Sequence, residues 1–219
     1  MTAKRLLHLA LISLVITLVG CSTTPIPAKI KSQMSTSQAI VAYFGNGETA
    51  QSCNCISEVD ANYSATPVPN GYYRVLLGRN AEGLFLIQDF YQKNKRAQSS
   101  PVWVKEPNDL FNFNSNVIIG SATLYYPDGK ILEVFTNTDR DSRNGEGFYK
   151  TGQRATKYVD DNTGTQFEFW YQSGKPAAKY TRSASGELTY AEAWDESGNK
   201  AEDIDAIINE ITKKMDTES

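Results

Sequence analysis

Short runs in which aromatic or β-branched residues alternate with polar ones recur along most of the chain. In the run 166–171, Phe167, Phe169 and Tyr171 stand at every second position. Side chains spaced in this way lie on one face of a β-strand. Each run is followed by a cluster of turn residues. The alternation therefore predicts a mainly β fold, built as an antiparallel meander of hairpins.

The turns between these runs share a pattern of aromatic residues, two or three turn residues, a glycine and then a polar or basic residue. The clearest copy is YYPDGK at 125–130, and other copies lie at 43–48, 148–153, 170–175 and 194–200. A glycine in this position supplies the positive φ that closes a hairpin with a bulge. We expect this role for Gly47, Gly129, Gly152, Gly174 and Gly198. In the copy at 90–95, Asn94 stands in the glycine position, and asparagine tolerates the left-handed conformation better than most residues.

The spacing of the glycines predicts a repeat. After Gly129, the next three turn glycines follow at intervals of 23, 22 and 24 residues. A unit of this length holds two strands and two turns, and successive units would bury their aromatic surfaces against each other. Upstream, Pro69-Asn70-Gly71 is a further turn signal. A dozen extra residues interrupt the period, and we place this insertion within Gln98–Asp109.

The pattern changes from strand to helix near the C-terminus. One helical stripe over 201–215 collects Ile204, Ile207, Ile208, Ile211 and Met215. Asn199 as N-cap, with Glu202 three residues later, resembles a capping box. We expect this helix to cap the open end of the sheet, with docking onto another protein as the alternative.

The first twenty residues have the pattern of a targeting segment. Lys4 and Arg5 precede an apolar run, Leu6–Val19, which is shorter than the ~20 residues of a membrane span. The run ends in Leu18-Val19-Gly20-Cys21, which resembles the lipobox of bacterial lipoproteins. That resemblance implies cleavage before Cys21 and attachment of diacylglycerol and palmitate-type acyl chains to this cysteine, which anchor a protein stably.

The same resemblance implies a location in the cell envelope. Ser22 after the cysteine favours the outer membrane, with the body on the periplasmic face. We therefore divide the chain into a signal peptide (1–20), a lipidated tether (21–36), a β-repeat domain (37–200) and a C-terminal helix and tail (201–219).

Charge and composition exclude several classes of function. The chain has 22 basic and 25 acidic residues, and loss of Lys4 and Arg5 leaves 20 − 25 = −5. An acidic body without a basic stripe argues against nucleic-acid binding. The one histidine, His8, lies in the cleaved segment, so no imidazole remains for Ser-His-Asp or Cys-His catalysis. We expect no cofactor, no metal site and no small-molecule substrate.

Two cysteines remain beyond the anchor, in Cys53-Asn54-Cys55. A disulfide across one intervening residue is strained but sterically possible, and an intermolecular disulfide is equally consistent with the spacing. Two inert thiols are the next alternative, and redox or metal chemistry is a third.

The repeated turns resemble the MORN-like repeats of the YwqK-type family, over roughly 38–200. YwqK-type proteins are often described as antitoxins, and other MORN-like repeats are scaffolds or binding surfaces close to membranes. The resemblance therefore implies a non-catalytic protein-binding module, either immunity-like or a structural adaptor of an envelope complex. A histidine-free hydrolase that uses carboxylates such as Asp160 and Asp161 is the alternative from another class.

The aromatic residues beside the turns have two interpretations. Alternation and turn spacing already account for them as sheet packing. If they are exposed they would form a protein-binding face, because Tyr and Trp concentrate in interface hot spots. The residues concerned are Tyr125, Tyr126, Tyr149, Trp170 and Tyr171.

Overall fold

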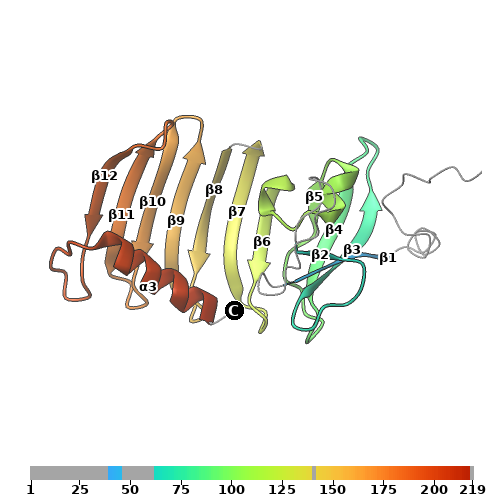
Figure 1. The fold of residues 1–219 in the computed structure, drawn as a ribbon, viewed down its shortest axis with the longest axis horizontal. Helices are drawn as coiled ribbons and strands as arrows, with labels where there is room; N and C mark the ends of the chain where they lie inside the picture. The colour runs from blue at the N-terminus through green and yellow to red at the C-terminus, as the bar shows by residue number, and fades with distance from the viewer. Residues whose placement is uncertain (1–38, 46–61, 140–141, 218–219) are drawn as a thin grey trace, which may run out of the picture.

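The computed structural model describes residues 39–45, 62–139 and 142–217, and their strands form one antiparallel sheet (Figure 1). From one edge to the other the strand order is β12-β11-β10-β9-β8-β7-β6-β5-β4-β3-β1-β2. From β3 to β12, consecutive strands therefore pair with each other, which is the predicted meander. The strands are β1 (Ala39–Phe44), β2 (Tyr63–Ser64), β3 (Tyr72–Arg79), β4 (Phe85–Tyr91), β5 (Val102–Val104), β6 (Ile118–Tyr125), β7 (Ile131–Asp139), β8 (Ser142–Phe148), β9 (Arg154–Asp161), β10 (Gly164–Trp170), β11 (Pro176–Ser183) and β12 (Leu188–Ala193).

Gly129, Gly152 and Gly174 lie in turns that join two strands, and Gly198 lies in a turn of the same form after β12, where Trp194 bridges Lys200. Gly129, Gly152, Gly174 and Gly198 have φ between 81° and 93°. In the first of these turns the Gly129 N–H donates to the carbonyl of Tyr126, and the Tyr126 N–H donates to the carbonyl of Lys130. The same pair of bonds recurs in the other three turns. Gly47 lies outside the described residues.

The turn after β4 differs from the prediction by one residue. Lys95, and not Asn94, has the positive φ, at 62°. The Lys95 N–H donates to the carbonyl of Tyr91, four residues back, where the other turns span three. The Asn94 side chain accepts the N–H of Arg96 at 3.0 Å. The extra residue moves the left-handed position onto a lysine.

The interruption of the repeat lies later in the chain than the sequence indicated. Val102–Val104 form β5, which pairs with β4 and β6, so the first half of Gln98–Asp109 belongs to the sheet. The extra residues instead form the connection from β5 to β6, with short 3-10 helices η1 (Pro107–Phe111) and η2 (Ser115–Val117). Arg74 fixes this insertion to the sheet. Its guanidinium is ion-paired with Asp89 at 2.7 Å and donates to carbonyls of the insertion, including that of Asp109 at 2.9 Å.

The C-terminal helix α3 (Ile204–Thr217) lies across one face of the sheet, over β10, β11 and β12 (Figure 1). The helix thus covers the face of the last three strands of the sheet, including the terminal strand β12. Ile207 and Ile211 are buried against Ala177, Ala178 and other residues of that face, because small side chains there let the helix approach. Ile204, Ile208 and Met215 pack against the same cluster, so the predicted stripe is confirmed.

The helix also begins later than predicted. The Asp203 carboxylate accepts the N–H of Ala206 at 2.9 Å, which is the bond of an N-cap residue. Asn199 belongs instead to the preceding turn, where its N–H donates to Asp195. Among the described residues, no helix is both long and apolar enough to cross a membrane.

Candidate functional site

Three of the five aromatic residues singled out in the sequence are core residues. Tyr126, Tyr149 and Tyr171 are 0%, 1% and 5% exposed, so they take no part in a binding face, and the packing interpretation holds for them. Tyr125 and Trp170 are half-buried. The guanidinium of Arg154 lies 4.6 Å from the centre of the Trp170 ring.

Each of the buried tyrosines also links its own turn to the next. The Tyr126 hydroxyl donates to the carbonyl of Phe148 at 2.7 Å, and the Tyr149 hydroxyl donates to that of Trp170 at 2.7 Å. The Tyr171 hydroxyl continues the series to Trp194 at 2.8 Å. We refer to these bonds as the tyrosine ladder. Each buried phenol has a hydrogen-bond partner, so none of these three hydroxyl groups is buried unpaired. This accounts for tyrosine at this position of the repeat.

Cys21, for which lipid attachment is predicted, and the cysteines Cys53 and Cys55 lie outside the described residues. The predictions made for them therefore remain predictions.

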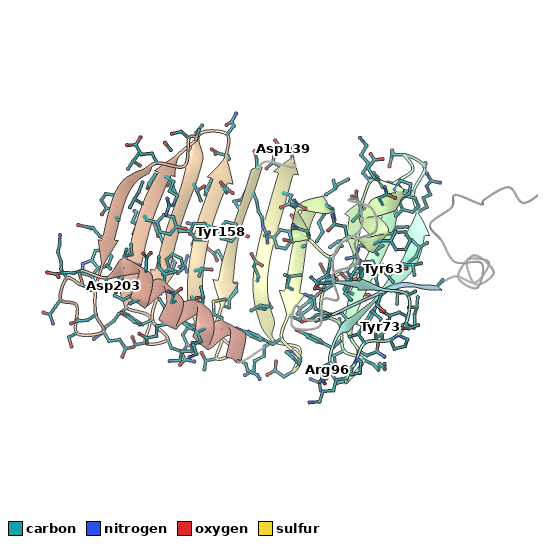
Figure 2. All side chains as sticks on the ribbon, in the orientation of Figure 1. Tyr63, Tyr73, Arg96, Asp139, Tyr158 and Asp203 are labelled. Carbon is teal, nitrogen blue, oxygen red and sulfur yellow. The ribbon has the colours of Figure 1, made fainter. Side chains whose placement is uncertain are left out.

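A cleft of about 660 Å³ opens on the face of the sheet that carries α3. One wall is α3, with Ile208, Thr212 and Met215, and Ser115 of η2 lines the cleft from the insertion. In Figure 2, Tyr158 marks the sheet beside the helix. The volume lies within the ~300–1,000 Å³ typical of ligand sites. The lining residues are Ser115, Leu132, Glu133, Arg143, Gly147, Thr156, Tyr158, Asp160, Phe167, Phe169, Tyr180, Ile208, Thr212 and Met215.

A row of rings across neighbouring strands forms the floor of the cleft. Phe167 is paired in register with Tyr158 of β9 and Tyr180 of β11, so the three side chains share one face. Their ring centres are 5.1 and 5.3 Å apart, with interplanar angles of 22° and 21°. Because the Phe167 faces are occupied by the neighbouring rings, this row offers ring edges to an occupant. Ring edges are apolar and carry the positive end of the aromatic quadrupole.

Two glycines of β8 leave space above this part of the sheet, because they carry no side chain. A Cβ on Gly145 would lie 2.7 Å from the Tyr158 hydroxyl and 2.8 Å from the Cβ of Phe135. A Cβ on Gly147 would lie 2.5 Å from the Thr156 hydroxyl and 3.0 Å from Met215. These positions accept only glycine without movement of their neighbours. β8 therefore leaves room for the side chains of β7, β9 and α3 to meet.

An ion pair with added hydrogen bonds stands at one end of the cleft. Arg143 and Glu133 are 2.9 Å apart, with side chains about one-quarter exposed. The Tyr158 hydroxyl donates to the same Glu133 oxygen at 2.6 Å. Arg143 also donates to the hydroxyl of Ser115 and lies 3.8 Å from the centre of the Phe135 ring. Among the described residues, the buried Nε of Arg143 has no hydrogen-bond partner.

The surroundings of the Tyr158 hydroxyl keep it protonated. Burial raises the pKa of Tyr158 well above its usual value of 10, and the charge and hydrogen bond of Glu133 raise it further. The phenol therefore remains a donor at neutral pH. Glu133 accepts bonds from both Tyr158 and Arg143, so its carboxylate is engaged as a hydrogen-bond acceptor.

The carboxylates considered for a hydrolase do not converge. Asp160 and Asp161 are successive residues of β9, and successive strand residues point to opposite faces. Asp160 lines the cleft and accepts the hydroxyl of Thr165 at 2.6 Å. Asp161 closes a turn, and hydrogen bonds from Thr163 lower its pKa. No group of three or more His, Cys, Asp or Glu residues suited to a metal ion occurs in the described part of the chain.

Sequence reasoning did not single out Glu133, Arg143 or Tyr158. A signal for Glu133 was present, because it alternates with Phe135 and Asn137 in β7 and so shares their buried face. Arg143 could not be found in this way, because its place in the site depends on a hydrogen bond to Ser115. The two residues are 28 positions apart, and the fold of the insertion brings them together. Neither the protein-family models nor the curated proteins compared with the chain give a match.

Proposed function

We propose that this protein is a non-catalytic protein-binding module, held in the cell envelope through a lipidated Cys21. The observation that carries the proposal is the cleft between α3 and the insertion. Its floor is apolar, and the two members of its ion pair are further hydrogen-bonded to Tyr158 and Ser115. Such a surface suits the apolar side chains of a partner better than a reacting substrate, because Glu133 is already engaged by two donors.

The shape of the cleft favours a peptide segment as the occupant. Its floor runs from β7 to β11, four strand spacings or about 19 Å across the sheet. The neighbouring strip of the same face already binds an amphipathic helix, since α3 buries Ile207 and Ile211 there. A second amphipathic segment lying beside α3 would use the helix-in-groove mode of recognition.

The sequence supports two forms of this protein-binding function. The resemblance to MORN-like repeats of YwqK type supports an immunity-like protein that neutralises a toxin in the envelope. A structural adaptor of an envelope complex is the alternative. The identity of the bound protein separates them, since an immunity protein binds a toxin and an adaptor binds a resident envelope component.

Site-specific photo-crosslinking in the lipidated protein tests the binding site. A photoreactive residue at Tyr180, in the cleft, should give one crosslinked protein partner, which mass spectrometry identifies. Thr181 is the matched control, because it follows Tyr180 on β11 and faces the other side of the sheet. Equal crosslinks at both positions, or none at Tyr180, would contradict the proposal.

A further inference from the structure

Basic residues gather on three neighbouring hairpin turns at one end of the strands. These turns span 91–96, 126–130 and 149–153. They contain five basic residues and one acidic residue, Asp128, so their net charge is +4, whereas the whole chain carries −3. We refer to the basic residues as the basic turn edge: Lys93, Lys95, Arg96, Lys130 and Lys150. Lys150 is half-buried, and the other four are exposed.

Direct contacts hold the three turns side by side. The Asn94 amide donates to the carbonyl of Pro127 at 2.8 Å, and Arg96 donates to the carbonyl of Asp128. The Lys150 ammonium lies 4.0 Å from the Asp128 carboxylate. The basic side chains are therefore presented together by a fixed row of turns.

The opposite ends of the same strands carry acidic residues. Asp139 ends β7, and Asp160 and Asp161 end β9. Figure 2 places Arg96 and Asp139 at opposite ends of the strands. The two ends of β7 and β9 thus differ in charge.

The backbone of the first turn provides an independent observation. Lys95 has φ 62°, in the position where the equivalent turns have Gly129, Gly152 and Gly174. A non-glycine residue in this conformation is strained, and such strain is concentrated at functional positions. Its ammonium lies 5.1 Å from the centre of the Tyr73 ring. Glycine would relieve the strain but would remove a positive charge from the tip of the turn.

We propose that the basic turn edge docks on an anionic phospholipid surface. This inference rests on the proposed lipid anchor, which would keep the membrane within reach. The 18 residues from Cys21 to Gln38 span at most about 60 Å, enough for the edge to meet the bilayer. The anchor then sets the distance between the folded body and the membrane, and the basic turn edge sets the orientation of the body on the membrane.

The composition of the edge favours lipid over an acidic protein. Four of its five basic residues are lysines, which are depleted in protein interfaces. Clustered lysines next to a membrane bind anionic headgroups instead, and salt weakens this binding. Docking in this way would leave the cleft on the side of the sheet, free for the proposed protein partner.

Lysine acylation of the lipidated protein on vesicles tests the proposal. On vesicles of phosphatidylethanolamine and phosphatidylglycerol, labelling of Lys93, Lys95 and Lys130 should fall about fivefold or more relative to phosphatidylcholine vesicles. High salt should restore it. Lys105, exposed on the insertion at the opposite end of the strands, is the control and should label equally on both. Equal labelling of the basic turn edge, or protection only after an acidic protein is added, would overturn the docking.

Flotation separates this result from failure of the anchor. Protein that floats with both vesicles but labels equally refutes the docking and keeps the anchor. Salt-sensitive flotation with the anionic vesicles alone keeps the docking and refutes the anchor. Protein that floats with neither refutes both.

The variant Lys95→Gly distinguishes docking from a structural role of this lysine. It should raise the midpoint of thermal unfolding, because the strain is relieved, and it should reduce the protection of Lys130 about fivefold. Lys105→Gln should change neither quantity. A Lys95→Gly protein whose Lys130 remains fully protected would contradict the assigned role.

Discussion

At the scale of single residues, buried hydroxyl groups and ion pairs join neighbouring parts of the described body. The tyrosine ladder satisfies a carbonyl beside each turn with a buried phenol. The cleft depends in the same way on Glu133, which accepts bonds from Arg143 and Tyr158. Removing one member of either arrangement leaves a partner buried without its bond, which costs more than the bond itself contributes.

We predict that Tyr149→Phe lowers the free energy of unfolding by about 1–2 kcal/mol, because the carbonyl of Trp170 loses its donor. Urea denaturation followed by circular dichroism measures the change. Tyr190→Phe is the control, since Tyr190 is 42% exposed and its loss should cost little. Equal effects of the two substitutions would show that the ladder contributes nothing specific.

We predict that Glu133→Gln destabilises the fold by about 1 kcal/mol, a value reduced because both side chains of the pair are about one-quarter exposed. The same denaturation assay measures it. Glu146→Gln removes a more exposed pair with Arg154 and should cost no more than about 0.5 kcal/mol. A neutral Glu133→Gln would mean that Arg143 finds another partner.

At the scale of elements, helix α3 is held by one buried stripe. Ile211 is 1% exposed and lies in the cluster formed with β10, β11 and β12. The helix supplies one wall of the cleft through Ile208, Thr212 and Met215. Weakening its docking should therefore disturb the cleft as well as the fold.

We predict that Ile211→Ala costs about 2–5 kcal/mol of stability, because it leaves a cavity beneath the helix. Asn209→Ala, on the exposed side of α3, should change stability by less than about 0.5 kcal/mol. Differential scanning calorimetry compares the two variants. A small effect of Ile211→Ala would indicate that α3 does not depend on this contact.

Elements and turns could be predicted from the sequence because their signals are local. Alternation gave the strands, and the glycine required at φ near 90° gave the turns at Gly129, Gly152 and Gly174. Lys95 was missed because one extra residue shifts the left-handed position without a change in composition. The cleft was missed because it needs Ser115, Arg143 and Thr212 together, and their meeting depends on where the insertion and α3 lie. That placement is set by tertiary packing.

At the scale of the whole molecule, buried tyrosines make the free energy of unfolding depend on pH in the alkaline range. Burial raises the pKa of Tyr63, Tyr72, Tyr91, Tyr158 and Tyr180 above 10. The folded state thus binds these protons more tightly than the unfolded state. Stability from this source is complete below pH 10 and is lost as the pH rises through the folded-state values.

We predict that the protein keeps its stability up to about pH 9 and unfolds cooperatively above about pH 10. Tyrosinate absorbance and circular dichroism should change together during a base titration. Tyr158→Phe should move the transition to higher pH, because it removes one of the raised pKa values. Tyrosines that ionise near pH 10 while the sheet remains folded would contradict the prediction.

The tyrosine ladder also bears on how long such a protein can be. Each hydroxyl bridges only to the turn that follows, so every junction of this kind is the same local joint whatever lies further along the chain. Duplicating the segment between two neighbouring ladder tyrosines would create one more such joint and leave the others undisturbed. Residues added between the strands of a segment can leave the bond intact, since the Tyr91 hydroxyl donates to the carbonyl of Tyr125 at 2.6 Å across the segment that contains the insertion. The molecule can therefore grow or shrink in whole steps of about two dozen residues, and a surface set on its turns would lengthen in the same steps.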